Sequence, residues 1–205
     1  YRKENKISEE KVKIAVVVQK MINSETSGVM FSIDPVKGDK DKIIIESVWG
    51  LGELIVQGSV IPDTYQVQKD TYSILSREIS DQRIMMTKKG DRNIEKEVPK
   101  NNRDKQKITN EDIVALAKLA QRLQDHYYFP QDIEWAKEGN ELFIIQTRPI
   151  TTIQKIKSAY AEDCIDIKTS ASPILQGISA SPGIASGKVK ILKNIHDLKK
   201  IEKGD

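Results

Sequence analysis

The stretch DIEWAKEGNELFIIQTRP, residues 132–149, alternates apolar and polar side chains on both sides of a Gly-Asn pair. Alternation with a period of two is typical of β-strands, and a Gly-Asn pair between two such runs is typical of a turn. The stretch therefore predicts a β-hairpin whose first strand covers residues 132–136 and whose second covers residues 141–148.

The register of this hairpin decides which side chains share a face. The apolar sets of both strands are buried together only if the loop has an odd length or a strand carries a β-bulge. A three-residue loop over residues 138–140 meets this condition, and it pairs Asp132 with Gln146 and Glu134 with Ile144. The buried set is then Ile133, Trp135, Phe143, Ile145 and Thr147.

The opposite face gathers Asp132, Glu134, Gln146 and Arg148 into one polar patch. Mg²⁺ prefers hard oxygen ligands, so the Glu134 carboxylate and the Gln146 amide oxygen are candidate metal ligands. Arg148 offers a fork of donors for phosphate oxygens. Transfer of a phosphoryl group needs mainly positioning and neutralisation of charge, which these groups supply. Polar residues on one strand face are also the ordinary solvent side of a sheet, and the pattern alone favours that alternative.

The rest of the chain predicts further strands and one long helix. Residues 109–127 are helical, with Thr109 as N-cap and Asp112 completing a capping box. The run at 12–18 is apolar on both faces and predicts a central strand. Shorter predicted elements are strands at 28–33, 42–48 and 64–69 and a helix at 53–57. The apolar face of the long helix consists of Ile113, Leu116, Ala117, Ala120 and Leu123.

Residues 83–107 have no clear periodicity and contain nine Lys or Arg against four Asp or Glu. This composition predicts a solvated loop or a polar hairpin. A nucleic-acid-binding module is the competing hypothesis, but aromatic side chains that would stack on bases are missing from the stretch. After residue 150 a polar linker at 151–175 is expected, followed by the start of a second domain at 176–205 with a strand at 188–192.

Overall composition is that of an ordinary globular protein. The 205 residues are 38% hydrophobic and 31% charged, with a formal net charge of +3, which implies no particular partner. The single cysteine, Cys164, favours a reducing compartment, so we expect a cytoplasmic location. No apolar run approaches the roughly 20 residues of a membrane-spanning helix. The chain lacks an initiating Met, so we expect it to be part of something longer.

Several strings in this order closely resemble the phosphoenolpyruvate synthases, relatives of pyruvate phosphate dikinases and rifampicin phosphotransferases. They are VVVQKM (16–21), SGVMFSIDP (27–35), GLGE (50–53) with VQG and PD following, DIEWA (132–136) and IQTRP (145–149). GISASPGIASGKV (177–189) resembles the start of that family's phosphohistidine domain. The stretch at 83–107 and the linker lie outside the resemblance.

The resemblance implies an α+β fold made of the C-terminal part of an ATP-grasp domain at 1–150, with the start of a phosphohistidine domain at 176–205. Glu134 and Gln146 would hold Mg²⁺ against the phosphates of ATP, Arg148 would contact the phosphates, and Asp132 would lie near the nucleotide. The base would lie beside Gln19, Lys20 and Met21 (19–21), for which core and edge packing is the alternative. Gly50-Leu51-Gly52 reads as a turn before a short helix, with Glu53 a weaker candidate.

The implied reaction converts pyruvate, ATP and water to phosphoenolpyruvate, AMP and phosphate through a phosphohistidine. The carrier histidine's motif is not in this chain, and we expect His126 and His196 to be surface residues without a role. The isolated chain is therefore expected to be inactive and to bind Mg-ATP weakly. Ser32 to Pro35 (32–35) favours a synthase over the related enzymes, a scaffold without ligand remains the non-enzyme alternative, and an oligomer is compatible with the sequence.

Overall fold

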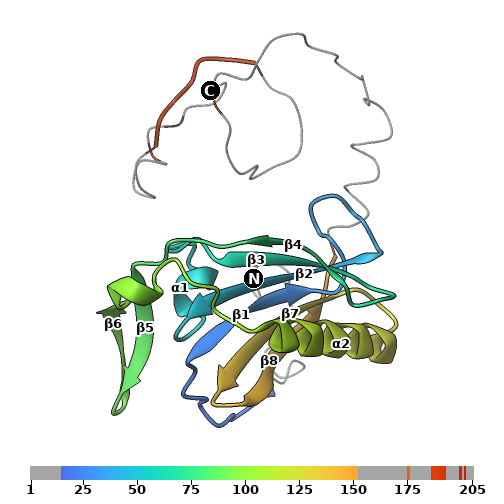
Figure 1. The fold of residues 1–205 in the computed structure, drawn as a ribbon, viewed down its shortest axis with the longest axis horizontal. Helices are drawn as coiled ribbons and strands as arrows, with labels where there is room; N and C mark the ends of the chain where they lie inside the picture. The colour runs from blue at the N-terminus through green and yellow to red at the C-terminus, as the bar shows by residue number, and fades with distance from the viewer. Residues whose placement is uncertain (1–14, 152–174, 176–185, 193–198, 200, 202–205) are drawn as a thin grey trace, which may run out of the picture. The chain divides into compact units, whose positions relative to one another are not determined.

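The computed structural model describes residues 15–151, 175, 186–192, 199 and 201. The chain divides into two compact units, residues 1–154 and 155–205. The first unit contains a six-stranded antiparallel sheet in the order β4-β3-β2-β1-β7-β8 and a separate hairpin of β5 and β6 (Figure 1). This mixed, mostly sheet architecture agrees with the α+β expectation. The elements are β1 (Thr26–Phe31), β2 (Lys42–Trp49), α1 (Glu53–Val56), β3 (Asp63–Gln68), β4 (Ile74–Glu78), β5 (Ile84–Lys89), β6 (Arg92–Glu97), η2 (Lys100–Asn102), α2 (Asn110–Tyr127), β7 (Gln131–Glu138) and β8 (Glu141–Pro149).

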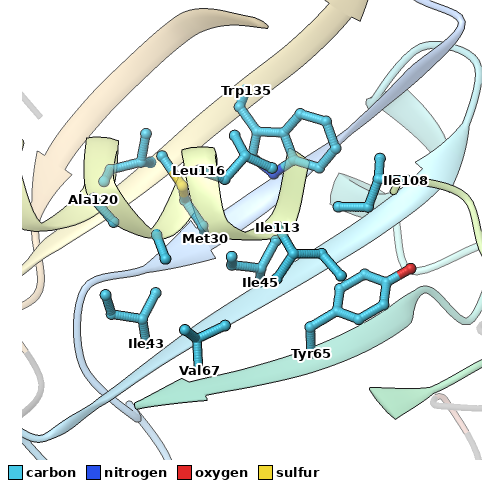
Figure 2. Close-up of a cluster of buried hydrophobic side chains, with 12 residues drawn as sticks. Met30, Ile43, Ile45, Tyr65, Val67, Ile108, Ile113, Leu116, Ala120 and Trp135 are labelled. Carbon is cyan, nitrogen blue, oxygen red and sulfur yellow. The ribbon is translucent and has the colours of Figure 1, made fainter. Parts of the chain in front are cut away.

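Helix α2 lies across one face of the six-stranded sheet, and the core fills the space between them (Figures 1 and 2). The predicted apolar face of the helix is confirmed. Four of its residues are buried, namely Ile113, Leu116, Ala117 and Ala120, and the fifth, Leu123, packs against the buried cluster. The sheet supplies alternate side chains from neighbouring strands, as a pleated sheet with one covered face requires. The largest of these are Trp135, Tyr65, Met30, Ile43, Ile45 and Ile133.

Both ends of α2 are defined by local chemistry. The Thr109 hydroxyl accepts from the Asp112 backbone N–H at 3.2 Å, and the Asp112 carboxylate accepts from the Thr109 N–H at 3.1 Å, so the predicted capping box is confirmed. Asp112 also pairs with Lys137 of β7, which ties the start of the helix to the sheet. The helix ends before Tyr128, which adopts a left-handed conformation with φ of 56°.

Most of the predicted strands and the short predicted helix are present, but two of the predicted strands are not present among the described residues. Strands β1, β2 and β3 and helix α1 lie close to their predicted ranges, whereas β4 was missed. The strand predicted at 12–18 is wrong over residues 15–18, which are irregular and exposed. The strand at 188–192 is also wrong, because those residues are irregular and exposed. Apolar runs form strands only where a neighbouring strand pairs with them, and neither run is paired in the sheets above.

Residues 12–14, residues 152–174 of the expected linker and most of the expected second domain, including His196, lie outside the described residues. His126 is exposed, as expected. Among the described residues, no helix is long and apolar enough to cross a membrane.

The basic stretch folds as the polar hairpin that its composition allowed. Strands β5 and β6 pair antiparallel, from Ile84 opposite Glu97 to Lys89 opposite Arg92. One of the nine basic residues of this stretch, Lys107, is buried. The side chain of Lys107 has no exposed area, and its Nζ lies 2.7 Å from Asp63, which is equally buried. The expectation of a solvated Lys107 is therefore wrong, because this ammonium group has a buried carboxylate partner from β3.

A dense hydrogen-bond network surrounds that ion pair. Asp63 accepts from the Tyr65 hydroxyl at 2.8 Å, the Ser80 N–H at 2.9 Å and the Lys107 N–H at 3.0 Å. Lys107 Nζ also donates to the Ser80 carbonyl at 2.6 Å. Burial raises the pKa of Tyr65, so its hydroxyl stays a neutral donor. The network fixes the two chain segments that lead into and out of the β5–β6 hairpin.

Candidate functional site

The β7–β8 hairpin has the predicted strands but a different register. Glu138 pairs with Glu141, so the loop has two residues, and Gly139 supplies its positive φ of 59°. A β-bulge on β8 then shifts the pairing between Glu134 and Trp135. The prediction of a three-residue loop was therefore wrong. The bulge adds the one extra residue that the longer loop was expected to add, and so brings Glu134 and Gln146 to the same face.

The bulge sets the polar patch in direct register. Glu134 pairs with Gln146, and Asp132 pairs with Arg148. The Gln146 amide donates to the Glu134 carboxylate at 3.5 Å, the upper limit for a hydrogen bond. Arg148 donates through Nε and Nη2 to one oxygen of Asp132, both at 2.8 Å. The four side chains thus share the sheet face that α2 leaves uncovered.

The same bulge changes which apolar residues of β8 are buried. Trp135 pairs with Ile144, and Leu142 and Ile144 pack against the core beneath α2. Phe143 pairs with Ala136 on the other face, and Ile145 lines the cavity described next. The expected burial of Phe143 and Ile145 with Trp135 is wrong, because the extra residue of the bulge reverses the alternation.

A cavity of about 470 Å³ opens on the uncovered face. Gln19, Lys20 and Met21 lie along one part of its wall, in an irregular segment. Glu134 contributes a carboxylate to the same cavity. Val29, Ile22 and Ile145 add apolar side chains to the lining. A mostly apolar cavity with a few polar groups at defined places is typical of small-molecule sites.

Three of the predicted site residues lie next to this cavity rather than in its wall. Asp132, Gln146 and Arg148 occupy the same sheet face as Glu134, on adjacent strand positions. The Arg148 side chain is 66% exposed, so its ion pair with Asp132 is weak and its guanidinium can turn to another anion. The donor set of carboxylates, an amide and a guanidinium suits a metal ion together with phosphate oxygens.

The loop before α1 forms another part of the wall. Leu51, Gly52 and Glu53 all line the cavity, and the predicted turn and short helix are both present. Gly50 has a φ of 80°, which explains the glycine at the start of this turn. Among the described residues, no group of at least three His, Cys, Asp or Glu side chains is arranged to hold a metal.

Glu46 is a further acid on the uncovered face that the sequence interpretation missed. It pairs with Val29, which pairs on its other side with Glu134, so Glu46 and Glu134 lie in one cross-strand row. Burial and the neighbouring Asp132 raise the pKa of Glu46. The signal was available, because Glu46 is the one acid in β2 and directly follows three consecutive isoleucines.

We expect Glu46→Gln to stabilise the protein at neutral pH. A raised pKa means that folding disfavours the ionised carboxylate, so the penalty grows as pH rises through the ordinary glutamate value of 4.5 and is absent well below it. The variant should therefore have a higher Tm than the wild type near pH 7 and the same Tm near pH 3, in metal-free and nucleotide-free buffer. A Tm difference that is equal at both pH values would contradict this assignment.

Comparison with known proteins adds an independent observation. A family model described as "Pyruvate phosphate dikinase, AMP/ATP-binding domain" matches residues 1–168. The chain is 45% identical over 205 residues to a probable phosphoenolpyruvate synthase of Methanothermobacter thermautotrophicus, and 45% identical over 205 residues to one of Archaeoglobus fulgidus. It is 38% identical over 214 residues to the phosphoenolpyruvate synthase of Pyrococcus furiosus. All of this chain is covered in each case, but it spans only 29%, 27% and 26% of these relatives.

Proposed function

Since this chain belongs to the pyruvate phosphate dikinase AMP/ATP-binding domain family, we propose that it holds ATP as the magnesium complex for the reaction of a phosphoenolpyruvate synthase. The observation that carries this proposal is the direct pairing of Glu134 with Gln146 at the edge of a cavity that extends to residues 19–21. In this proposal the paired side chains would offer oxygen ligands beside the phosphates of a nucleotide in the cavity.

The residues on the uncovered face take separate roles in this proposal. Glu134 and Gln146 would hold Mg²⁺, which when bound neutralises phosphate charge. Arg148 would leave its exposed ion pair with Asp132 and donate to phosphate oxygens. Asp132 would keep the guanidinium oriented until the nucleotide arrives. These groups position and stabilise charge, which is the main requirement of phosphoryl transfer.

The adenine would occupy the apolar part of the cavity. Met21, Ile22 and Val29 offer surface for the base, and the irregular backbone at 19–21 has N–H and C=O groups that are not committed to a strand. Irregular backbone beside an apolar cavity can read the edge of a purine through hydrogen bonds. Gln19, Lys20 and Met21 would therefore recognise the base mainly through their backbone.

For the full-length protein we propose the conversion of pyruvate, ATP and water to phosphoenolpyruvate, AMP and phosphate in the cytoplasm. Residues 1–150 would be the C-terminal part of an ATP-grasp domain, 151–175 a linker, and 176–205 the start of a phosphohistidine domain. The relatives are named phosphoenolpyruvate synthases, which supports pyruvate as acceptor over rifampicin.

Calorimetric titration of the full-length protein with ATP tests this proposal. We expect ATP to bind clearly more tightly with Mg²⁺ than with the metal chelated, because the paired oxygens lack a positive partner without it. Gln146→Ala is expected to remove most of this gain and to leave the affinity for metal-free ATP unchanged. Equal affinity with and without Mg²⁺ in the wild type would contradict the proposed metal site.

A further inference from the structure

The β5–β6 hairpin docks against the turn that precedes α1 through backbone contacts. The Leu51 N–H donates to the Met86 carbonyl at 2.8 Å, and Gly50 forms a bridge with Met86. A Cβ at Gly50 would lie 2.2 Å from that carbonyl oxygen, so only glycine permits this approach. The hairpin is therefore held in a fixed place beside the cavity wall.

This docking brings one side chain of the hairpin to the cavity. Asn93 of β6 lines the cavity, and its amide donates to Glu53 Oε2 at 3.2 Å. The Gln57 amide donates to the other oxygen, Glu53 Oε1, also at 3.2 Å. Two neutral amides, one from the end of α1 and one from β6, thus orient one carboxylate at the cavity wall.

The chemistry of this carboxylate restricts what it can recognise. An ionised carboxylate only accepts hydrogen bonds, and each oxygen has lone pairs left after accepting one amide N–H. It repels phosphate, so its favourable partners in a cavity for a nucleotide are a cation or the N–H and O–H donors of the ligand. The sugar of a ribonucleotide presents two adjacent hydroxyl donors, a spacing that suits the two oxygens of one carboxylate.

We propose that the Glu53 carboxylate accepts hydrogen bonds from the ribose hydroxyls of the bound nucleotide. Asn93 is then a positioning residue, which orients Glu53 and so favours ribonucleotides over deoxyribonucleotides. This inference rests on the proposed function, because it takes the ligand to be a nucleotide. It gives the β5–β6 hairpin a role in substrate selection, although the hairpin lies outside the β7–β8 patch.

The test compares ATP with 2′-deoxy-ATP and 3′-deoxy-ATP in the full-length protein. We expect Asn93→Ala to raise the KM for ATP by about threefold, the loss of one modest hydrogen bond, with little change in kcat. In the same variant the KM values for both deoxy analogues are expected to rise less than the KM for ATP. The ratio of the deoxy-ATP KM to the ATP KM should therefore fall. Asn93→Gln, which keeps an amide, should restore part of the preference, and Glu53→Gln should narrow it as well.

Lys96→Ala is the matched control, because Lys96 is exposed on the same strand and does not line the cavity. It is expected to leave all three KM values unchanged. Equal KM increases for ATP and both deoxy analogues in Asn93→Ala would overturn the inference and leave a merely structural contact. A different result would contradict the proposed metal site without touching this inference: the wild type would bind ATP with the same affinity with and without Mg²⁺ and still prefer ATP to both deoxy analogues.

Discussion

Glu134→Gln is expected to lower the kcat for ATP-dependent release of AMP in the full-length protein by about 100-fold, the scale of losing one preorganised electrostatic group. The variant keeps the length of the side chain and its contact with Gln146, and it removes only the negative charge. With less charge at the ligand position, Mg²⁺ binds more weakly and the phosphates lose part of their neutralisation. The measurement is AMP formation at saturating ATP over a series of Mg²⁺ concentrations.

The Mg²⁺ series separates this explanation from damage to the fold. Glu134→Gln is expected to need more Mg²⁺ for half-maximal rate and to keep a Tm close to that of the wild type. Glu138→Gln is the matched control, since Glu138 lies on the same face of β7 four residues further on and pairs at the turn with Glu141. If both variants lose the same activity, or if the Mg²⁺ requirement of Glu134→Gln is unchanged, the metal role is wrong.

The polar patch could be predicted from sequence although the register was wrong. Alternation placed Asp132 and Glu134 on one face, and the need to bury Trp135 fixed which face it was. Two structures satisfied that requirement, a three-residue loop or a bulge, and both put Gln146 on the face of Glu134. The choice between them depends on the backbone near Gly139, which hydrophobic pattern does not determine.

The cavity could be predicted less well, because its wall comes from segments far apart in the chain. Asn93 reaches the cavity wall through hairpin docking, and Glu46 lies in one row with Glu134 through strand order. Neither arrangement has a local sequence signal, although Glu46 stands out as the one acid of β2 and Glu53 was a candidate from the sequence. Asn93 lies in the stretch that composition predicted to be polar and solvated. A count of charges describes the average residue of such a stretch, so it misses both an exposed side chain that lines a cavity, such as Asn93, and a basic residue that the fold buries.

Lys107 is the clearest case of such a residue, and its replacement by Met is expected to lower the free energy of unfolding by about 3–5 kcal/mol. The variant leaves the Asp63 carboxylate fully buried without its cation and leaves the Ser80 carbonyl without one donor. The hydrogen bonds from Tyr65 and from the Ser80 and Lys107 N–H groups remain, which favours the lower end of that range. Urea unfolding of the first unit's sheet, followed by circular dichroism, measures the change.

Two further variants decide whether the buried charge is the cause. Arg83→Met breaks an ion pair with Asp81 whose side chains are 76% and 49% exposed, so it is expected to cost at most about 1 kcal/mol. Adding Asp63→Asn to Lys107→Met removes the unpaired charge, so the double variant should be more stable than the sum of the single losses predicts. Additive losses, or a Lys107→Met no worse than Arg83→Met, would mean that the pair is not a principal anchor of the β5–β6 hairpin. The position of the hairpin beside Glu53 would then depend on its other contacts, among them those of Met86 with Gly50 and Leu51.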